Sequence, residues 1–580
     1  MYGGIPSSFN MLTFTPTASN WLVTRLMYLG FAPFVFANGT TDFTNSLTDW
    51  MSHNANYTQW TFNVRPGTMW SNGQPVTAND ILSTYSSKFA LNTTVDFLNF
   101  HQEVARSYAL NDSAAVFVLN KSDAHFPDLA GQNVYTAVYP PSFISSGVAY
   151  SGINGTDVGD GPFYVSNYAQ GQSQMTMLRN PYYKPLPAVC KVIINFVEAS
   201  SQVPTYLLAG TSDFGGVPPG SVSSLTSNPH MHLYDTQAVR SLTMMYNLTE
   251  APFNQLAFRQ ALAYGVNQSE IQSQAYRGYF TMAYAAEGGI PPESTLWYNA
   301  NQQKYSYNVS KALALLNSIG IKKGSDGYLQ YSNGTDVSLT IFADNSITEL
   351  TLSGGIVTQN LQKLGFKVTF DSVPISTIIG YTYSNTNNIW DGIIMDQSGG
   401  PVFGLPYLDA LPSWQVYEPL APYPTWMAPA NIEAEYSGNL SIVQGTDNSS
   451  VIKGALLNIQ ALGAQYLPNI HLGYPDAVNV YSTQNWVNWP NFITYGLDTA
   501  WNDRGFAQLQ PVGSQQATSN TSTSSSSSTQ ATSSLSSSSS PTTSGSGLNA
   551  TYIYAAIAVI VIIVIAAVAV LMMRRPPRPQ

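Results

Sequence analysis

A stretch of the chain between positions 390 and 431 combines aromatic side chains with amide groups that could contact a ligand. Its aromatic members are Trp390, Trp414, Tyr417, Tyr423 and Trp426, and its amides are Gln415 and Asn431. Aromatic faces beside amide and hydroxyl groups suit sugar rings or the apolar side chains of a peptide. The same residues could instead pack in a core or between lobes, so the pattern leaves both interpretations open.

No residue pattern predicts catalysis, a cofactor or a metal. The sequence has no Gly-x-Ser-x-Gly elbow and no Walker loop, and its six histidines form no catalytic arrangement. His230 and His232 flank one methionine, but two histidines without a third ligand are typical of a surface. Cys190 is the single cysteine, so an intrachain disulfide, a cysteine zinc site and a thiol redox pair are excluded. We therefore expect a binding protein rather than an enzyme, with no cofactor and no metal.

The C-terminal part of the chain predicts a membrane anchor. Residues 552–573 carry no charge and are long enough to cross about 30 Å of hydrocarbon as a helix. Three arginines follow within residues 574–580, and the positive-inside tendency places that tail in the cytoplasm. Residues 1–511 then form an extracellular body, and the Ser/Thr-rich residues 512–551 form a flexible linker. We expect a single-pass protein of the cell membrane with a large extracellular N-terminal domain.

The N-terminal sequence does not explain how such a body is exported. The first residues, MYGGIPSSFN, lack the basic region and the apolar core of a secretory signal. We expect that the natural start lies upstream or that the chain is truncated.

Charge is scarce, and glycosylation acceptors are frequent. Charged residues make up 9% of the chain, where about 25% is usual, and the net charge is -10 at pH 7. Few titrating groups mean little change of stability with pH, which favours an acidic external medium and an acidophilic source. A heavily glycosylated surface protein at ordinary pH is the alternative. The Asn-x-Ser/Thr acceptors are Asn38, Asn56, Asn92, Asn111, Asn120, Asn154, Asn247, Asn267, Asn308, Asn333, Asn439, Asn448, Asn520 and Asn549.

Helical and strand-like patterns alternate through the body. The segment TQWTFNVRP alternates apolar and polar residues as a half-buried strand does, and VSLTIFA and FKVTFDSV are β-branched runs. Helical spacing predicts helices over residues 77–90, 257–276, 310–319, 351–364 and 452–467. In the first of these, Thr77 is the expected N-cap and Asp80 lies in the first turn. This alternation indicates an α/β body.

Four segments carry motifs of spaced Gly, Pro, Asn and Arg residues. They are TFNVRPGTMWSNGQPVTANDILSTY, VGDGPFYVSNYAQGQSQMTMLRNPYY, NLTEAPFNQLAFRQALAYGVNQSEI and YNVSKALALLNSIGI. In chain order they resemble family 5 of the bacterial and archaeal extracellular solute-binding proteins, the oligopeptide, dipeptide, nickel and oligosaccharide class. The Ser/Thr linker and C-terminal anchor resemble the archaeal type. Asn72, Asn267 and Asn308 stand where the family often has Asp.

The residues that match the family's motifs are expected to be architectural, because they fix turns, cap a helix or connect elements. They include Arg65, Pro66, Gly67, Trp70, Gly73, Pro75, Thr77, Ala78, Asp80, Gly159, Gly161, Pro162, Arg179, Asn180, Pro181, Tyr183, Pro252, Phe253 and Arg259.

The resemblance implies a two-lobed, periplasmic-binding-protein-like α/β fold of class II with an extra subdomain. It places lobe I at about 1–22, 158–246 and 477–511, an accessory subdomain at about 23–157, and lobe II at about 247–476. Lobes of such proteins close on a solute around a hinge. The implied partners are a small-molecule ligand, an ABC permease and its ATPase subunits, and no nucleic acid is expected.

The resemblance leaves the ligand open. Family members that bind peptides have an acidic residue near a Trp-x-x-Asp-Tyr stretch, which this chain lacks; Asp391 matches a strand-end Asp, and Asp396 is a possible substitute. The expected ligand contacts are therefore Trp390, Asp396, Trp414, Tyr417 and Trp426. An oligopeptide or dipeptide is the first hypothesis and an oligosaccharide the alternative. A passive glycosylated surface or adhesion protein is the alternative of another class, but it predicts repeats and none is found.

Overall fold

The computed structural model divides the chain into two units, Met1–Ala517 and Thr518–Gln580. It describes residues 18–35, 41–43, 46–91, 103–127, 137–140, 144, 158–169, 171–236, 240–246, 248, 251–283, 290–292, 296–375, 377–378, 393–399, 430–489 and 503–513. All of these residues belong to the first unit. The expected membrane helix at 552–573 and most of the linker lie outside them. In the described part, no helix is long and apolar enough to span a membrane.

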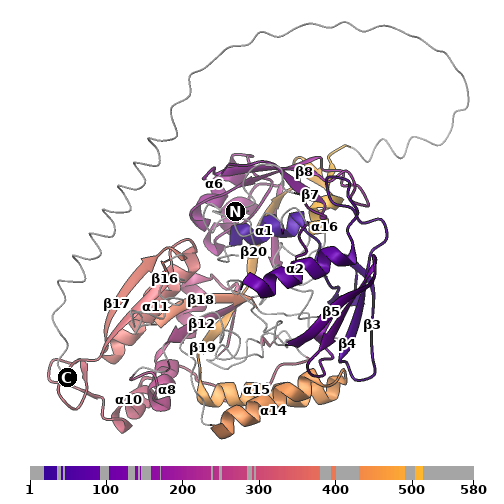
Figure 1. The fold of residues 1–580 in the computed structure, drawn as a ribbon. Coiled ribbons are helices and arrows are strands. Elements are labelled where there is room, and N and C mark those ends of the chain that lie inside the picture. The colour runs from indigo at the N-terminus through magenta and orange to yellow at the C-terminus, as the bar shows by residue number, and fades with distance from the viewer. Residues whose placement is uncertain are drawn as a thin grey trace, which may run out of the picture. The chain divides into compact units, whose positions relative to one another are not determined.

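A four-stranded antiparallel sheet forms from the first half of the first unit (Figure 1). Its strand order is β3-β4-β6-β5, with β3 Thr48–His53, β4 Gln59–Val64, β6 Ala114–Leu119 and β5 Val104–Asn111. Strand β4 alternates buried and half-buried residues, because one face of the sheet packs on the core. Helix α2 (Ala78–Leu91) packs beside β5 and β6.

Two three-stranded antiparallel sheets follow. The first has the order β7-β8-β9, with β7 Phe163–Asn167, β8 Gln174–Arg179 and β9 Lys191–Asn195. The second has the order β10-β20-β11, with β10 Phe214–Gly216, β20 Ala477–Ser482 and β11 Met231–Thr236. Helices α6 (Val203–Leu208) and α7 (Val222–Thr226) share a small apolar cluster with the second sheet. The central strand of that sheet therefore comes from the far end of the unit.

The largest sheet has six strands, in the order β13-β19-β12-β18-β16-β17 (Figure 1). They are β13 Phe280–Met282, β19 Ile470–Pro475, β12 Arg240–Tyr246, β18 Ile393–Gly399, β16 Ser338–Asp344 and β17 Lys367–Val373. Strand β16 runs parallel to both of its neighbours, whereas the other pairs are antiparallel. Helix α11 (Thr348–Leu364) connects β16 to β17, as a parallel pair requires.

The chain passes twice between the second three-stranded sheet and the six-stranded sheet. It leaves β11 at Thr236 and enters β12 at Arg240, and it leaves β19 at Pro475 and enters β20 at Ala477. Strand β11 pairs with β20, and β12 pairs with β19. Two neighbouring backbone segments thus connect the two sheets.

Two large apolar cores hold the unit together. The first joins α1 (Ala18–Met27) and the sheets of β3–β9 to α14 (Ala430–Gln444) and α15 (Ser449–Tyr466). The second surrounds the six-stranded sheet with α8 (Leu256–Gly265), α10 (Val309–Ser318) and α11. Burial of such apolar area is the main favourable term in folding.

Most of the expected elements are confirmed. Helices α2, α10, α11 and α15 occupy the predicted positions within three residues at each end, and β4, β16 and β17 lie on the predicted strands. The exception is the single helix expected over 257–276. It is interrupted at Val266 and Asn267, which have extended backbones, and continues as α9 (Gln268–Glu270) and the π-helical η5 (Ile271–Ala275). The Asn267 N–H donates to Asn360 Oδ1 at 2.6 Å instead of to a helical carbonyl.

The remaining described elements are short. They are β1 Phe34–Val35, β2 Thr41–Asp42, β14 Lys322–Lys323, β15 Leu329–Gln330, β21 Trp486–Val487, β22 Gln510–Pro511, α16 Asp503–Gln508, η3 Ser200–Gln202 and η4 Pro219–Ser221.

Candidate functional site

Four of the five expected ligand residues, Trp390, Trp414, Tyr417 and Trp426, lie outside the described residues. The fifth, Asp396, lies in β18 opposite Thr243 of β12. Whether these residues contact a ligand stays a prediction.

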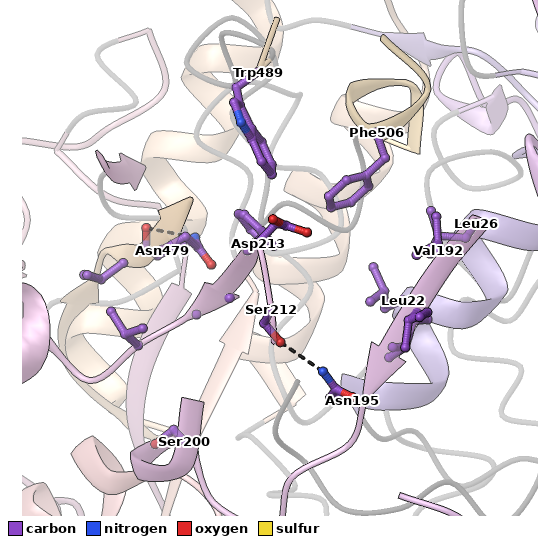
Figure 2. Close-up of a pocket in the computed structure, with 18 of the residues that line it drawn as sticks. Leu22, Leu26, Val192, Asn195, Ser200, Ser212, Asp213, Asn479, Trp489 and Phe506 are labelled. Atoms are coloured by element: carbon purple, nitrogen blue, oxygen red, sulfur yellow. Dashed lines mark hydrogen bonds between the residues drawn. The ribbon is translucent and has the colours of Figure 1, made fainter. Parts of the chain in front are cut away.

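A cavity of about 450 Å³ is bordered by several elements of the first unit (Figure 2). Leu22 and Leu26 of α1 line one side, and β9 and β10 line two others. Trp489 and Phe506, from the segments after β20, complete the wall. None of these residues was expected to contact a ligand, because they come from five separate parts of the chain.

The cavity meets two open strand edges. Consecutive residues 191–195 of β9 and 213–217 around β10 all line it. Side chains alternate between the faces of a strand, so lining by consecutive residues means that the cavity borders the backbone edge. Among the described strands β9 pairs with β8 alone, and β10 pairs with β20 alone. Backbone N–H and C=O groups along such edges could bind an extended main chain, as in strand addition to a sheet.

A polar contact lies in the lining of the cavity. The Asn195 side-chain amide, at the end of β9, donates to Ser212 Oγ at 3.0 Å and to the Thr211 carbonyl at 3.2 Å (Figure 2). This contact links the segment before β10 to β9, so the two open edges are held in a fixed relation.

An aromatic group forms the opposite wall. The rings of Phe214 and Trp489 are stacked with centroids 6.1 Å apart, and Phe506 meets Phe214 edge-on at 5.6 Å. The Trp489 indole N–H donates to the Ser482 carbonyl at 3.0 Å, which orients the ring. Such a wall can pack against an apolar group of a ligand.

Residues from the neighbourhood of the six-stranded sheet also line the cavity. Tyr276, Ile347 and Pro475 contribute from that side. Nearby, the Ser200 N–H donates to the Ser346 carbonyl at 2.9 Å, and the hydroxyls of Ser200 and Thr348 lie 3.1 Å apart. The cavity is therefore lined both by the β10-β20-β11 sheet and by residues near the six-stranded sheet, the two sheets that the two chain passages connect.

The signature residues of the first two motifs form one buried cluster. The Gly161 N–H donates to the Met27 carbonyl at 2.7 Å, and the Ser71 N–H donates to the Gly159 carbonyl at 2.9 Å. A Cβ at Gly161 would lie 2.7–2.8 Å from backbone atoms of Leu26 and Met27, so only glycine allows this approach. The cluster attaches α1 to both motifs.

Asn180 belongs to the same cluster, whereas Arg65 contacts the segment before β3. The Asn180 side-chain amide donates to the Gly161 carbonyl at 3.1 Å, and its backbone N–H donates to the Pro162 carbonyl at 2.8 Å. Pro181 follows directly in the turn. The Arg65 guanidinium donates to the carbonyls of Phe43 and Ser46.

The turn between β4 and α2 contains the other signature residues of the first motif. Gly67 and Gly73 have φ of 76° and 84°, a conformation that favours glycine. Trp70 is 1% exposed, and Met69 bridges to Pro75 across the turn. Helix α2 begins directly after Thr77, whose N–H donates to Asp80 Oδ2 at 2.8 Å.

Asp160, between the two motif glycines, carries a buried carboxyl group that the sequence analysis missed. It is 1% exposed, and its Oδ1 accepts from the Leu29 N–H at 3.0 Å. Burial raises its pKa to about 7; the hydrogen bond opposes this shift, and the negative charge of Asp80 adds to it. Burial also raises the pKa of Asp80.

Arg259 of α8 is 1% exposed and connects separate elements. Its guanidinium donates to the carbonyls of Phe253, Tyr466 and Leu467 at 2.6–3.2 Å. Burial lowers its pKa. These contacts link α8 to the end of α15.

The described residues contain no group of three or more His, Cys, Asp or Glu side chains placed to hold a metal. His232 Nε2 instead lies 3.1 Å from Thr483 Oγ1.

Residues 43–416 match the family model of bacterial extracellular solute-binding proteins, family 5 middle, over more than half of the chain. The chain belongs to this family.

Two solved structures establish the α/β, periplasmic-binding-protein-like fold of family 5 for this chain. The oligopeptide-binding protein of Bacillus subtilis in complex with a nonapeptide has a TM-score of 0.72 and 19% identity, covering 88% of this chain and 97% of that one. The mannohexaose-bound periplasmic oligopeptide-binding protein of Thermotoga maritima has a TM-score of 0.73 and 18% identity, with the same coverage.

Sequence relatives match shorter parts. The family 5 chain is 28% identical over 220 residues to heme-binding protein A of Haemophilus influenzae, covering 37% of this chain and 39% of that protein. It spans less than two thirds of the length of the curated relatives that it matches first.

The residues of the candidate cavity had only weak sequence signals. Trp486 and Trp489 line the cavity and occur in the motif NWVNW. The spacing of its aromatic residues does not distinguish ligand contact from packing in a core. In this family 5 chain the first two signature motifs form the buried cluster and the third and fourth contribute α8 and α10, whereas the cavity residues lie outside all four motifs.

Proposed function

We propose that the chain is the extracellular substrate-binding subunit of an ABC importer, which captures a small solute and delivers it to a membrane permease and its ATPase subunits. The observation that carries this proposal is the family match over residues 43–416 together with a fold shared with solute-bound proteins. The family is defined by solute binding, so no reaction is assigned to the chain.

The capture step would be closure of two lobes around a hinge. The proposed lobe I comprises about 1–22, 158–246 and 477–511, lobe II about 247–476, and the accessory subdomain about 23–157. The short connections from β11 to β12 and from β19 to β20 support a hinge, because few residues separate the strands there. Strand β12 pairs with β18 and β19 in the six-stranded sheet. This pairing favours a boundary between lobe I and lobe II before Arg240 rather than after Tyr246.

The proposed ligand is an oligopeptide or dipeptide. Peptide-binding proteins are frequent among the relatives, and the open edges of β9 and β10 suit an extended main chain. Mannohexaose in one structural neighbour makes an oligosaccharide the second candidate. The Phe214, Trp489 and Phe506 wall could pack against either ligand.

The proposed protein is anchored at the cell surface by residues 552–573, with 512–551 as its linker and 574–580 in the cytoplasm. The support is the uncharged run, the arginines that follow it and the extracellular family. An archaeal source, an acidic medium and a glycosylated surface remain parts of the proposal that the sequence pattern supports.

The test is a thermal-shift screen of the full-length chain in detergent against defined peptides, malto-oligosaccharides and manno-oligosaccharides. A ligand at 100 times its Kd should add about 2.7 kcal/mol to the free energy of unfolding. Trp489→Ala should weaken the peptide shift because it removes half of the stacked wall. Trp50→Ala is the matched control, since Trp50 is 53% exposed on β3 and does not line the cavity.

One result would contradict the proposed function, and another would contradict the proposed binding site. Absence of any shift with all three ligand classes would argue against solute capture of this kind. An unchanged peptide shift in the Trp489 variant would remove the cavity from the binding site while leaving the family role in place.

A further inference from the structure

Eight glycosylation acceptors lie within the described residues, and their side-chain amides are in different states. They are Asn56, Asn111, Asn120, Asn267, Asn308, Asn333, Asn439 and Asn448. Transfer of a glycan requires the side-chain nitrogen, Nδ2, because that atom forms the new bond. The hydrogen bonds of Nδ2 and Oδ1 therefore separate usable acceptors from blocked ones.

Asn111 ends β5 in the turn that leads to β6. Its Oδ1 accepts hydrogen bonds from both the N–H and the hydroxyl of Ser113, each at 2.9 Å. Both donors belong to the third residue of the same acceptor sequence. The residue is exposed, and its Nδ2 donates to no group of the described residues.

Asn333 lies in a second tight turn, between β15 and β16. Its Oδ1 accepts from the Thr335 N–H at 2.9 Å, and the Gly334 N–H donates to the Tyr331 carbonyl at 2.9 Å. Asn333 is exposed, and within the described part of the chain its Nδ2 makes no hydrogen bond. In both turns the oxygen end of the planar amide is held by the backbone, which leaves the nitrogen end outward.

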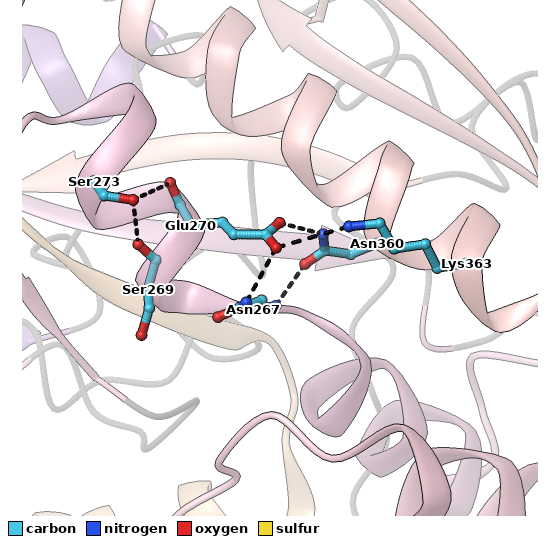
Figure 3. A network of polar contacts seen from close by, with 6 residues as sticks. All are labelled: Asn267, Ser269, Glu270, Ser273, Asn360 and Lys363. Carbon is cyan, nitrogen blue, oxygen red and sulfur yellow. Dashed lines mark hydrogen bonds and ion pairs between the residues drawn. The ribbon is translucent and has the colours of Figure 1, made fainter.

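Asn267 has the opposite arrangement (Figure 3). Its Nδ2 donates to Glu270 Oε1 at 3.2 Å, while Asn360 donates to Glu270 Oε2 at 2.8 Å. Lys363 lies 3.7 Å from Glu270 Oε1 and adds its positive charge. The nitrogen of this half-buried residue is thus engaged in a polar network that joins the start of α9 to α11.

Asn439 is enclosed between two helices. It is 8% exposed, its Nδ2 donates to the Glu435 carbonyl at 2.8 Å, and its Oδ1 accepts from Asn458 of α15 at 3.1 Å. A sugar on this nitrogen would have to separate α14 from α15.

We propose that Asn111 and Asn333 are N-glycosylated and that Asn267 and Asn439 are not. The donor would be a lipid-linked oligosaccharide phosphate. The bond from its sugar C1 to the phosphate oxygen breaks, C1 bonds to Nδ2, the phosphate keeps the electron pair, and Nδ2 loses one proton. The inference rests on the extracellular location in the proposed function and adds the positions at which the surface is modified.

The two sites leave the candidate cavity accessible. None of the eight described acceptors lines it. Asn111 lies at the end of the four-stranded sheet, and Asn333 lies beside the edge hairpin of β14 and β15. Bulky sugars there would cover exposed turns and leave the residues that border the cavity uncovered.

The test is mass spectrometry of glycopeptides from the full-length protein, purified from the membranes of the cells that encode it. We expect a glycan mass on the peptides that contain Asn111 and Asn333, and unmodified peptides for Asn267 and Asn439. Unmodified Asn111 and Asn333, or a glycan at Asn267 or Asn439, would overturn the assignment.

Matched variants in the same cells distinguish a glycan lost because the acceptor sequence is destroyed from a glycan lost because the turn has changed. Thr335→Ala should lose one glycan mass, whereas Thr335→Ser should keep it, because serine retains the hydroxyl and the backbone N–H. Ser113→Ala and Ser113→Thr form the same comparison at the other turn, and Asn439→Gln should leave the glycan mass unchanged. Solute binding is measured on the same samples, so loss of the binding function and loss of the glycans are distinguished.

Discussion

At the scale of single residues, Asp160 makes the stability of the folded chain depend on pH. Its carboxyl group is buried beside the Leu29 backbone, and its pKa is raised to about 7. Between pH 4 and 7 the folded state holds a proton that the unfolded state has released. The contribution of this group to the free energy of unfolding is therefore fully present below pH 4. It is lost as the pH rises from 4 through 7. Burial also raises the pKa values of Asp80 and Asp344, and partial burial raises that of Asp235.

We predict that the chain is more stable at pH 4 than at pH 7, and that Asp160→Asn removes a large part of the difference. The expected size is on the order of 4 kcal/mol, because each pKa unit corresponds to about 1.4 kcal/mol. This is a larger pH dependence than the scarcity of charged residues predicts, because burial gives one carboxyl group a large shift. Urea unfolding at both pH values measures it. Asp336→Asn is the control, since the hydrogen bond from Lys367 lowers the pKa of Asp336 and places its effect below this range. Greater wild-type stability at pH 7 would refute the prediction.

Gly161 is the second residue with a large expected effect. A methyl group at this position would contact backbone atoms of Leu26 and Met27, which cannot move aside as a side chain can. We predict that Gly161→Ala lowers the free energy of unfolding by about 1–3 kcal/mol or more. Gly355→Ala, inside α11 with open space around its Cβ position, should instead be neutral or stabilising. Equal effects of the two substitutions in denaturant unfolding would contradict this reading of the motif.

At the scale of elements, the edges of β9 and β10 make a prediction about ligand binding. If a peptide binds along them, their amide hydrogens become protected from exchange. Saturating peptide should slow exchange in β9 and β10 but not in β17, which is also paired on one side alone among the described strands. Exchange mass spectrometry of the full-length chain measures both. Unchanged exchange in the presence of bound peptide would exclude these edges, and protection without peptide would show that another segment of the chain pairs with them.

The elements were predictable where the signal was local. Asn308 caps α10 by accepting from the Lys311 N–H at 2.9 Å, and Gly365 ends α11 with φ of 111°, so both boundaries follow from neighbouring residues. The break at Asn267 was not predictable, because its cause is Asn360, 93 residues away.

The candidate site was less predictable than the fold. Its wall combines Leu22, Phe214, Trp489 and Phe506, and no local pattern brings these residues together. The signature motifs were recognisable in the sequence because they make tight turns with fixed residue types. Those turns position the sheets, whereas the residues that border the cavity lie outside the motifs.

At the scale of the whole molecule, the two chain passages between sheets give the proposed hinge its physical basis. One passage contains the single residue Asp476, and the other contains three residues. The large cores lie on either side: the second surrounds the six-stranded sheet, and the first joins α1 to α14 and α15. The first core also contains Trp297 and residues of α14 and α15, which the proposed boundaries assign to lobe II. Motion about the two passages therefore requires that this part of 247–476 moves with the first core.

The last prediction concerns how the molecule is held at the cell surface. Deletion of residues 549–580 should release the protein into the soluble fraction, because it removes the uncharged run 552–573 and the arginines after it. The released protein should keep its thermal shift with ligand, since both cores and the cavity lie within residues 18–513. A chain that lacks residues 521–540 but keeps 552–573 is the control and should stay with the membrane fraction. Membrane retention of the protein without 549–580 would mean that another part of the chain, or a partner, anchors it.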